Sequence, residues 1–253
     1  MNFISYAQNF EDVMLWRAFK EVQNGFYIDI GAQDPIVDSV SKAFYENGWR
    51  GIHVEAISQY VEKLKKDRPD EQVFEYVICD KDIEEIEFYE IPDTGISTGD
   101  PIIASTHEKN GFKVNKIKLP CISLSSLFNA IEDKQVHWLK IDVEGMEKNV
   151  LNSWGNHPIR PQIIVIESTV PLTQIDTSDD WKHLLIERDY KEVYFDGLNR
   201  FYIYKDYLEL SKFFKVPPNI FDNFYLAGTA NSTLCYLLNK KNSELEKKLL
   251  NNK

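Results

Sequence analysis

The sequence lacks several features by which broad functional classes are recognised. Its 253 residues include 3 cysteines, Cys79, Cys121 and Cys235, which lie far apart and form no C-x-x-C pair. This spacing favours reduced, mostly buried thiols in an intracellular protein. No apolar run approaches the length of about 18 residues that a membrane-spanning helix needs, and the N-terminus lacks a basic region followed by an apolar one. We therefore expect a soluble, cytoplasmic protein.

Positive charge is scarce as well. The formal net charge is −11, and Lys and Arg form no long cluster. Proteins that bind a nucleic-acid backbone neutralise its phosphates with such clusters. Nucleic acid is therefore not the expected partner, whereas a neutral or cationic small substrate is compatible with this charge. Hydrophobic residues make up 43% of the chain and aromatic ones 13%, enough to bury a sizeable core.

Two glycine-rich phosphate-binding motifs are also missing. Only Gly31 of the three glycines in G-x-G-x-x-G is present, and no G-x-x-x-x-G-K-[ST] occurs. In their place, a buried-strand pattern at residues 26–30 leads into Gly31, and a helix is expected to begin after Asp38 and Ser39. A strand, a glycine turn and a helix form the first unit of a nucleotide-binding α/β domain, whose ligand lies at the strand's carboxyl end.

Acidic residues at successive strand ends indicate the type of ligand. Asp29 lies two residues before Gly31, and Glu55 ends the next expected strand, residues 51–55. The two acids are about 26 residues apart, near the spacing at which an acid binds a ribose diol. Because an acid at the turn suits an ammonium better than a pyrophosphate, we predict S-adenosylmethionine, which has both groups. A third strand at residues 73–79 ends in Asp80, which could contact the adenine amino group, with Asp82 as a competitor.

A second group of acids follows the strand expected at residues 136–141. Asp142 and Glu144 come directly after it, and Glu147 opens the next helix. Carboxylates this close repel one another, so a divalent cation, a network of substrate hydroxyls or solvent must stabilise them. Glu167 ends the next strand, at the adjacent strand tip. We favour a functional interpretation, in which Asp142, Glu144 and Glu167 are catalytic and Asp142 and Glu167 are candidate Mg²⁺ ligands.

The remaining patterns complete an α/β fold. An Asp-Gly turn between residues 191–195 and 200–204 predicts a hairpin. Parallel βα units that close in a hairpin give a Rossmann-like, mostly parallel sheet of seven strands, with the last strand antiparallel and helices on both faces. Other expected elements are helices at residues 11–22, 40–47, 59–67, 123–131 and 180–187, and strands at residues 86–91 and 116–121.

Two loops and the tail lie outside this pattern. Residues 94–101 are rich in glycine and hydroxyls, and we expect a loop in which Ser97 and Thr98 contact the substrate. Residues 213–230 are expected to form a second loop that shapes the acceptor pocket. From Leu234 onward, leucines alternate with Lys, Glu and Asn. This pattern predicts a helix that either mediates oligomerisation or links to further sequence.

With these residues in view, the chain resembles the FkbM-type family of class I S-adenosylmethionine-dependent methyltransferases. The resemblance runs from residue 5 to about residue 204, and its most specific part is Asp-x-Glu-Gly at residues 142–145. Residues 167–169 and 195–201 are similar to a subgroup associated with glycosyltransferases in surface-polysaccharide pathways. Residues 33–35 depart from the family pattern, which tends to have Asn and a second glycine there. The matching segments are SYAQNFED at 5–12, YIDIGA at 27–32, VE at 54–55 and KIDVEG at 140–145.

The resemblance implies a strand order of 3-2-1-4-5-7-6 and methyl transfer to a hydroxyl oxygen of a sugar in a surface glycan or polysaccharide. It also implies a methyltransferase domain at residues 1–232 that includes an N-terminal lid, followed by a helical tail or linker at 233–253. A glycan acceptor and fused or associated glycosyltransferase domains are the implied partners. The cofactor-binding residues carried over are Gln8 and Asp12 from the lid, Asp29, Gly31 and Ala32 at the methionine half, Glu55 and Ala56 at the ribose, and Asp80 near the adenine.

Three alternatives remain open from the sequence. The acceptor could be the hydroxyl of a non-sugar natural product. The chain could be a binding module that keeps the fold without the chemistry, against which Asp29, Glu55 and Asp142 all count. A nicotinamide-linked oxidoreductase is the third alternative, and the missing glycines disfavour it.

Overall fold

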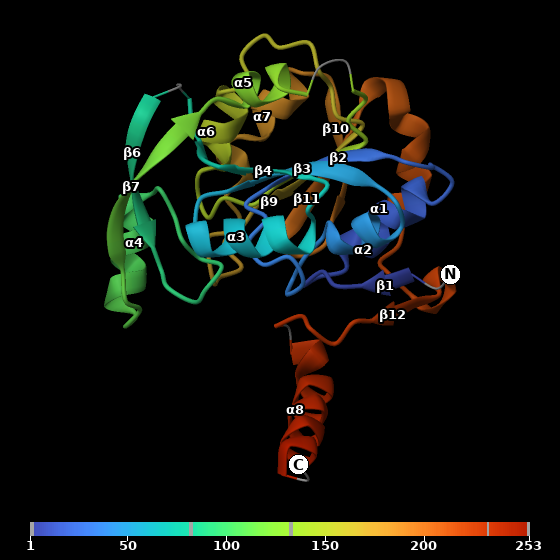
Figure 1. The fold of residues 1–253 in the computed structure, drawn as a ribbon. Coiled ribbons are helices and arrows are strands. Elements are labelled where there is room, and N and C mark those ends of the chain that lie inside the picture. Colours follow the sequence, from blue (N-terminus) through green and yellow to red (C-terminus); the bar gives the residue numbers. More distant parts are fainter. Residues whose placement is uncertain (1–2, 81–82, 132–133, 232, 252–253) are drawn as a thin grey trace.

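A mixed sheet of seven strands runs through the centre of the protein (Figure 1). The structure is a computed structural model that describes residues 3–80, 83–131, 134–231 and 233–251. Five neighbouring strands of this sheet (β4, β3, β2, β8 and β9, with the bounds given next) are mutually parallel, whereas β11 is antiparallel to both of its neighbours. From one edge to the other, the strands are β4 (Gln72–Glu75), β3 (Arg50–Glu55), β2 (Phe26–Ile30), β8 (Trp138–Ile141), β9 (Ile163–Glu167), β11 (Asn199–Tyr204) and β10 (Tyr190–Phe195).

Numbered over the whole chain, the central sheet has the order 4-3-2-8-9-11-10, which differs from the expected one. The numbers differ because five strands belong to two further sheets. Numbered within the central sheet alone, the order from the β4 edge is 3-2-1-4-5-7-6. The two further sheets were not expected. One pairs β1 (Phe3–Ser5) with β12 (Phe224–Leu226), and the other contains β5 (Val77–Ile78), β7 (Asn115–Ile122) and β6 (Ile83–Glu90).

Helices cover both faces of the central sheet, as expected (Figure 1). Side chains of successive strand residues alternate between the faces, so Ile28 and Leu139 pack on the side of α5, α6 and α7. Tyr27 and Trp138 pack on the side of α1 and α2, where their rings stack at 4.6 Å. The helices are α1 (Glu11–Phe19), α2 (Lys42–Glu46), α3 (Ser58–Asp67), α4 (Pro101–Lys109), α5 (Leu124–Asn129), α6 (Glu147–Asn152), α7 (Lys182–Ile186) and α8 (Tyr236–Asn251).

The expected strand at residues 73–79 is broken in two at Tyr76. Its first half, β4, joins the central sheet, whereas its second half, β5, pairs with β7 in the side sheet. A disulfide between Cys79 and Cys121 joins the chain just after β5 to β7. This corrects the expectation that all three cysteines are reduced. Cys235 is free, and all three cysteines are buried, as expected.

Helix α4 is a second departure, since no helix was predicted after the loop at residues 94–101. Asp100 caps it by accepting hydrogen bonds from the backbone N–H groups of Ile102 and Ile103, and Pro101 occupies its first turn. Proline at the first position of a helix, directly after an acidic cap, is a common helix start. We had assigned Pro101 to the end of a loop instead.

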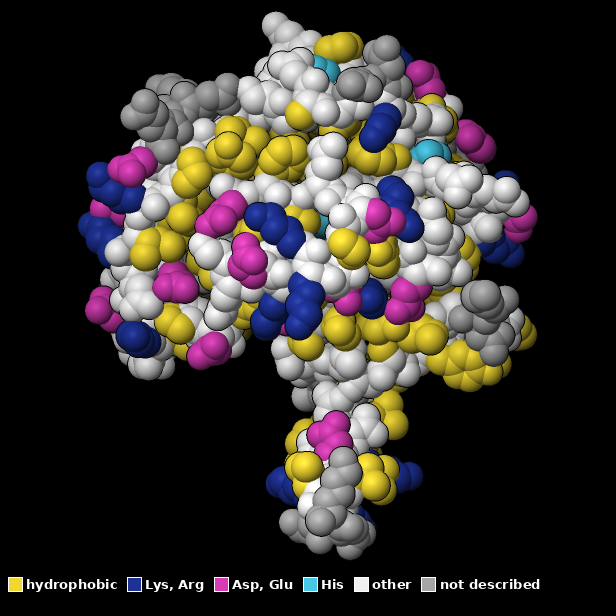
Figure 2. All heavy atoms as spheres, in the orientation of Figure 1, with side chains coloured by type: hydrophobic (Ala, Val, Ile, Leu, Met, Phe, Trp, Pro, Cys, Tyr) yellow, Lys and Arg dark blue, Asp and Glu magenta, His cyan; other side chains and the backbone are white. Residues whose placement is uncertain are grey.

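The C-terminal helix α8 projects away from the body of the protein (Figure 1). Its leucines lie on the surface, among them Leu237, Leu249 and Leu250, each more than two thirds exposed. Figure 2 shows apolar side chains interspersed with basic and acidic ones along the projecting helix. Within the described residues, the structure has no helix that combines the length and the apolar character needed to cross a bilayer.

Candidate functional site

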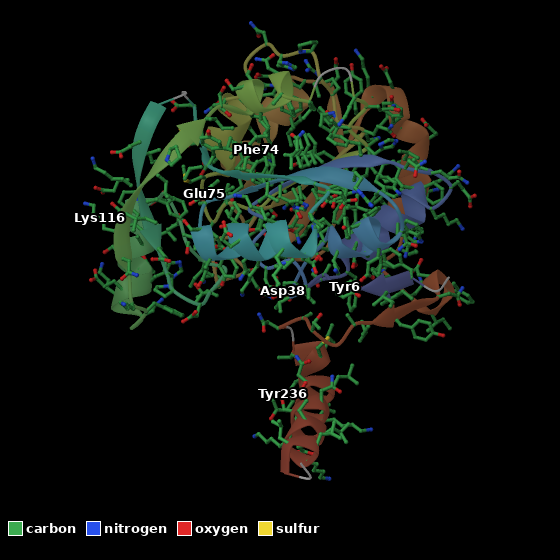
Figure 3. The ribbon with its side chains drawn as sticks, in the orientation of Figure 1. Tyr6, Asp38, Phe74, Glu75, Lys116 and Tyr236 are labelled. Atoms are coloured by element: carbon green, nitrogen blue, oxygen red, sulfur yellow. A yellow bond between two sulfur atoms is a disulfide. The ribbon has the colours of Figure 1, made fainter. Side chains whose placement is uncertain are left out.

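A cavity of about 250 Å³ opens at the carboxyl ends of β2, β3 and β8. The loops after these strands line it, together with residues 94–97 and with Gln8 and Glu11 near the N-terminus. Asp38 lies at its rim, at the edge of the body nearest the segment that leads to α8 (Figure 3). Asn231 from that segment also lines the cavity and donates a 2.9 Å hydrogen bond from its backbone N–H to Asp38.

The turn at Gly31 brings the ends of β2 and β8 into direct contact. Gly31 has a φ of +78°, and a Cβ atom built there would lie 1.7 Å from the backbone oxygen of Asp142. The Gly31 N–H donates to the carbonyl of Val54 at 2.9 Å, which fixes the turn against β3 as well. Glycine is required here by both its conformation and its lack of a side chain. The predicted tight turn is confirmed.

Asp29 lies beneath this turn and lines the cavity with only 2% of its surface exposed. Its Oδ2 accepts a 2.6 Å hydrogen bond from the Ser41 hydroxyl. Its Oδ1 is buried and has no hydrogen-bond partner among the described residues. Because an unpaired buried carboxylate oxygen is costly, this atom is suited to accept a hydrogen bond from a ligand.

Glu55 is the last residue of β3 and lies beside Asp29 in the cavity wall. It accepts 2.8 Å hydrogen bonds from the backbone N–H groups of Gln33 and Ile57. Burial nevertheless raises the pKa of Glu55 to about 7. The carboxylate is therefore held in one orientation while its charge remains poorly solvated, which favours a ligand that donates hydroxyl hydrogens to it.

The structure brings several other predicted cofactor residues to the same cavity. Ala32 and Ala56 line it next to Gly31 and Glu55, and Gln8 reaches it from the N-terminal segment. The wall beyond Glu55 is largely apolar or aromatic and would suit a flat heterocycle. It consists of Ile57, Tyr60, Tyr76, Val77, Ile78 and Phe88.

Asp80, predicted near the adenine, does not line the cavity. The chain leaves the central sheet at Tyr76, and Asp80 then follows the disulfide-bonded Cys79 as an exposed residue. Its competitor, Asp82, lies outside the described residues. Tyr76 and Ile78, which precede Asp80, form the cavity wall instead. The sequence pattern did not show that the strand would break before it reached its acid.

Asp12 is also absent from the cavity, although it is fully buried. Its carboxylate accepts hydrogen bonds from the Ser5 hydroxyl at 2.8 Å and from the backbone N–H groups of Tyr6 and Ala7 at 2.8 and 3.2 Å. Burial raises the pKa of Asp12 to about 6. Asp12 therefore shapes the N-terminal segment from within. Of these two neighbouring acids, it is Glu11, which the sequence did not single out, that lines the cavity.

Three predicted catalytic acids meet at the tips of β8 and β9. One carboxylate oxygen from each of Asp142, Glu144 and Glu167 lies within 4.8 Å of the other two. Lys140 lines the cavity and places its Nζ 2.5 Å from Asp142 Oδ2. Burial, and next the charge of Asp142, hold the pKa values of Glu144 and Glu167 well above their usual range. Glu144 Oε2 and Glu167 Oε2 are buried without a hydrogen-bond partner among the described residues.

The hydroxyls predicted to contact substrate take two different positions. Ser97 lines the cavity, although its Oγ also accepts a 3.0 Å hydrogen bond from the Ile91 N–H. Thr98 is fully buried and does not line the cavity, since its hydroxyl donates a 2.7 Å hydrogen bond to the carbonyl of Glu144. Glu144 has a φ of +51°, a conformation that non-glycine residues rarely adopt. Thr98 therefore braces the backbone of Glu144.

Sequence reasoning missed several polar residues of this site, among them Glu11, Lys140 and Asn231. Glu11 and Lys140 are within motifs that we had singled out, so their proximity to the predicted acids was a usable signal. Burial, together with the charge of Asp196, raises the pKa of Glu11 to about 8. Asn231 lies in a segment with no recognisable pattern, and only the folded chain brings it to the cavity.

Comparison with known proteins agrees with this geometry. The model of the FkbM methyltransferase domain matches residues 29–192, well over half of the chain. The protein belongs to this family. The match begins at Asp29 and includes Glu55, Asp142 and Glu144, so most of the acids that line the cavity lie in the family region. Glu167 does not line the cavity, but it also lies in this region. No curated protein matches the chain. As an FkbM-domain protein, the chain is a methyltransferase.

A variant of Asp12 tests whether this residue shapes the N-terminal segment. We expect Asp12→Ala to lower the free energy of unfolding by about 1–3 kcal/mol, because buried backbone N–H groups of the N-terminal segment lose their acceptor. Urea denaturation followed by fluorescence measures this. Unchanged stability combined with a large loss of cofactor affinity would instead make Asp12 a ligand-binding residue.

Proposed function

We propose that the protein is an S-adenosylmethionine-dependent O-methyltransferase that acts on a hydroxyl of a sugar in a surface glycan or polysaccharide. The observation that carries this proposal is the acid cluster of Asp142, Glu144 and Glu167. Glu144 and Glu167 are poorly solvated within it, and Asp142 and Glu144 line the same cavity as Asp29 and Glu55. One part of the cavity suits the cofactor, and the acid cluster next to it suits a polyhydroxylated acceptor.

The cofactor fits this cavity by charge and polarity. The free oxygen of Asp29 would accept a hydrogen bond from the methionine ammonium, and Gly31 leaves room for the chain of the amino acid. Glu55 would accept hydrogen bonds from both ribose hydroxyls, as acids at this position do in related folds. The adenine would lie against the apolar wall that contains Tyr60 and Tyr76. Together these contacts would place the sulfonium near the tip of β8.

The acid cluster can assist the transfer itself. The acceptor oxygen attacks the methyl carbon in line with the sulfur, so an O–C bond forms while the C–S bond breaks and leaves a neutral thioether. The hydroxyl proton must pass to a base, and a sugar hydroxyl is too weakly acidic to ionise unaided. Asp142 and Glu167 would orient the hydroxyls by accepting their hydrogen bonds, and Glu144 would take the proton. Holding the acceptor oxygen about 3 Å from the methyl carbon supplies much of the rate.

The same cluster offers a fit for Mg²⁺. Its donors are all carboxylate oxygens, which this hard cation prefers, and Glu144 and Glu167 each have a buried oxygen without a partner among the described residues. Asp142 and Glu167 would hold the ion, with Glu144 as a third ligand in place of its role as base. When bound, the cation would lower the pKa of a coordinated hydroxyl.

Calorimetry and a transfer assay test the proposed function. We expect micromolar binding of S-adenosylmethionine and S-adenosylhomocysteine and no binding of NAD. Transfer of a labelled methyl group to a panel of sugars and oligosaccharides, with polyketide and peptide alcohols as the comparison, then identifies the acceptor. Transfer to a non-sugar alcohol alone would overturn the glycan proposal. Absence of cofactor binding would overturn the enzymatic one and leave a binding module that retains only the fold.

Variants of the acid cluster test its catalytic role. We expect Asp142→Asn and Glu167→Gln to lower kcat by about 10²–10⁴-fold, the usual contribution of a positioned acid–base group, with little change in cofactor affinity. Asp189→Asn, at an exposed acid outside the cavity, should leave kcat unchanged. Full activity of Asp142→Asn would eliminate the cluster from catalysis. Undiminished turnover after exhaustive chelation would eliminate only the metal.

The raised pKa of Glu55 predicts a pH dependence of cofactor affinity. Ribose hydroxyls donate to the ionised carboxylate, which forms as the pH rises through about 7. We therefore expect the Kd for S-adenosylmethionine to increase as the pH falls from 8 to 6, measured by calorimetry at constant ionic strength. Glu55→Gln should bind more weakly at pH 8 and lose this dependence. A wild-type slope that persists in the variant would assign the titration to another group.

A further inference from the structure

A fully buried arginine lies behind the predicted cofactor loop. Arg68 directly follows α3, and its side chain has no exposed surface. It was not singled out in the sequence, where it reads as the last residue before a proline that ends a helix. A buried guanidinium is costly unless its donors and its charge are satisfied. Its partners therefore indicate what it does.

The Arg68 guanidinium holds the loop after β2 at three points. Its Nη2 donates to the carbonyl of Pro35 at 2.8 Å and to the hydroxyl of Ser39 at 2.9 Å. Its Nη1 donates to the hydroxyl of Ser41 at 2.7 Å. The loop that begins at Gly31 is thereby attached from behind to the end of α3. A lysine could not make these contacts together, because its donors lie on a single atom.

The hydrogen bond from Arg68 to Ser41 is linked to Asp29 in the cavity wall. The Ser41 hydroxyl accepts from Arg68 and donates its own hydrogen to Asp29 Oδ2 at 2.6 Å. This bond occupies one oxygen of Asp29 and leaves the other, Oδ1, without a partner among the described residues. The hydrogen-bond chain therefore determines which carboxylate oxygen Asp29 can present to a ligand.

Charge supports the same role. Asp29 and Arg68 are both buried, and the Ser41 hydroxyl hydrogen-bonds to each of them. The Arg68 Nη1 also lies 3.0 Å from His53 Nε2. His53 packs between them, with Nδ1 3.9 Å from Asp29 Oδ2 and Nε2 2.7 Å from Glu71. Glu71 in turn lies 4.0 Å from the guanidinium. Arg68 thus brings a positive charge to the same buried network as Asp29 and Glu71.

We propose that Arg68 is a positioning residue for the amino-acid end of the cofactor, acting through Ser41 on Asp29. This inference rests on the proposed use of S-adenosylmethionine. It assigns to Arg68 and Ser41 a role that is specific to one end of the ligand. The nucleoside end contacts Glu55 and the apolar wall, which the Arg68 side chain does not touch.

Two ligands and two variants separate this role from a general effect on the fold. Kd values are measured by calorimetry for S-adenosylmethionine and for 5′-methylthioadenosine, which lacks the ammonium and carboxylate. Arg68→Lys removes the three-point attachment. Ser41→Ala removes the hydroxyl that joins Arg68 to Asp29, with its 3.4 Å contact to Ser39, and keeps the Arg68 bonds to Pro35 and Ser39. Arg50→Lys is the matched control, since Arg50 stacks on the same Tyr45 ring as Arg68 but is solvent-exposed and bonded to Asp70.

We expect both variants to bind S-adenosylmethionine at least tenfold more weakly, the usual size of a lost charge-assisted contact, and to bind 5′-methylthioadenosine within about twofold of the wild type. The control should change neither Kd. If Arg68→Lys does not fold, Ser41→Ala alone decides the matter. Equal losses for both ligands, or no loss, would overturn the inference. A wild type that binds neither ligand would overturn the proposed cofactor, and with it this inference.

Discussion

The close approach of two strand tips is the constraint on which the site depends. With no side chain at Gly31, the turn after β2 contacts the backbone of Asp142 at the end of β8. Acids that end neighbouring strands are thereby drawn into one small, poorly solvated volume. A Cβ at this glycine would separate the strands and enlarge the cavity. The dense negative charge at this site is therefore a consequence of backbone packing as much as of side-chain composition.

The acids of the site differ in the groups that stabilise their carboxylates. Backbone N–H groups donate to the Glu55 carboxylate. The Ser41 hydroxyl, which accepts from Arg68, donates to Asp29, and Lys140 pairs with Asp142. Glu144 and Glu167 have the least support, since each retains a buried oxygen with no partner among the described residues. Buried polar groups in native proteins are normally satisfied. The unsatisfied pair therefore marks the place where a ligand contributes.

Sequence patterns predicted the strands and the acids at their ends, because an apolar run, a glycine and an acid in succession are purely local signals. They failed where a long-range contact decides the outcome. Asp80 follows a strand that breaks to join another sheet, and Asp12 and Thr98 turn inward to satisfy backbone groups of neighbouring segments. Arg68 has no local signal for this role, since the groups of the β2 loop to which it donates are 27 to 33 residues away in the sequence. The overlooked α4 is different, because Asp100 and Pro101 form a recognisable helix start.

The cavity wall is formed by residues of the family region and by residues outside it. The matched region, residues 29–192, supplies the strand tips and their acids. Gln8, Glu11 and Asn231 lie outside it, yet all three line the same cavity. Pairing of β1 with β12 joins the two ends of the chain, so these covering residues are positioned together. A ligand that fills the cavity contacts both parts. Under the proposed function, the residues for methyl transfer would come from the family region, and segments on either side of it would help to select the acceptor.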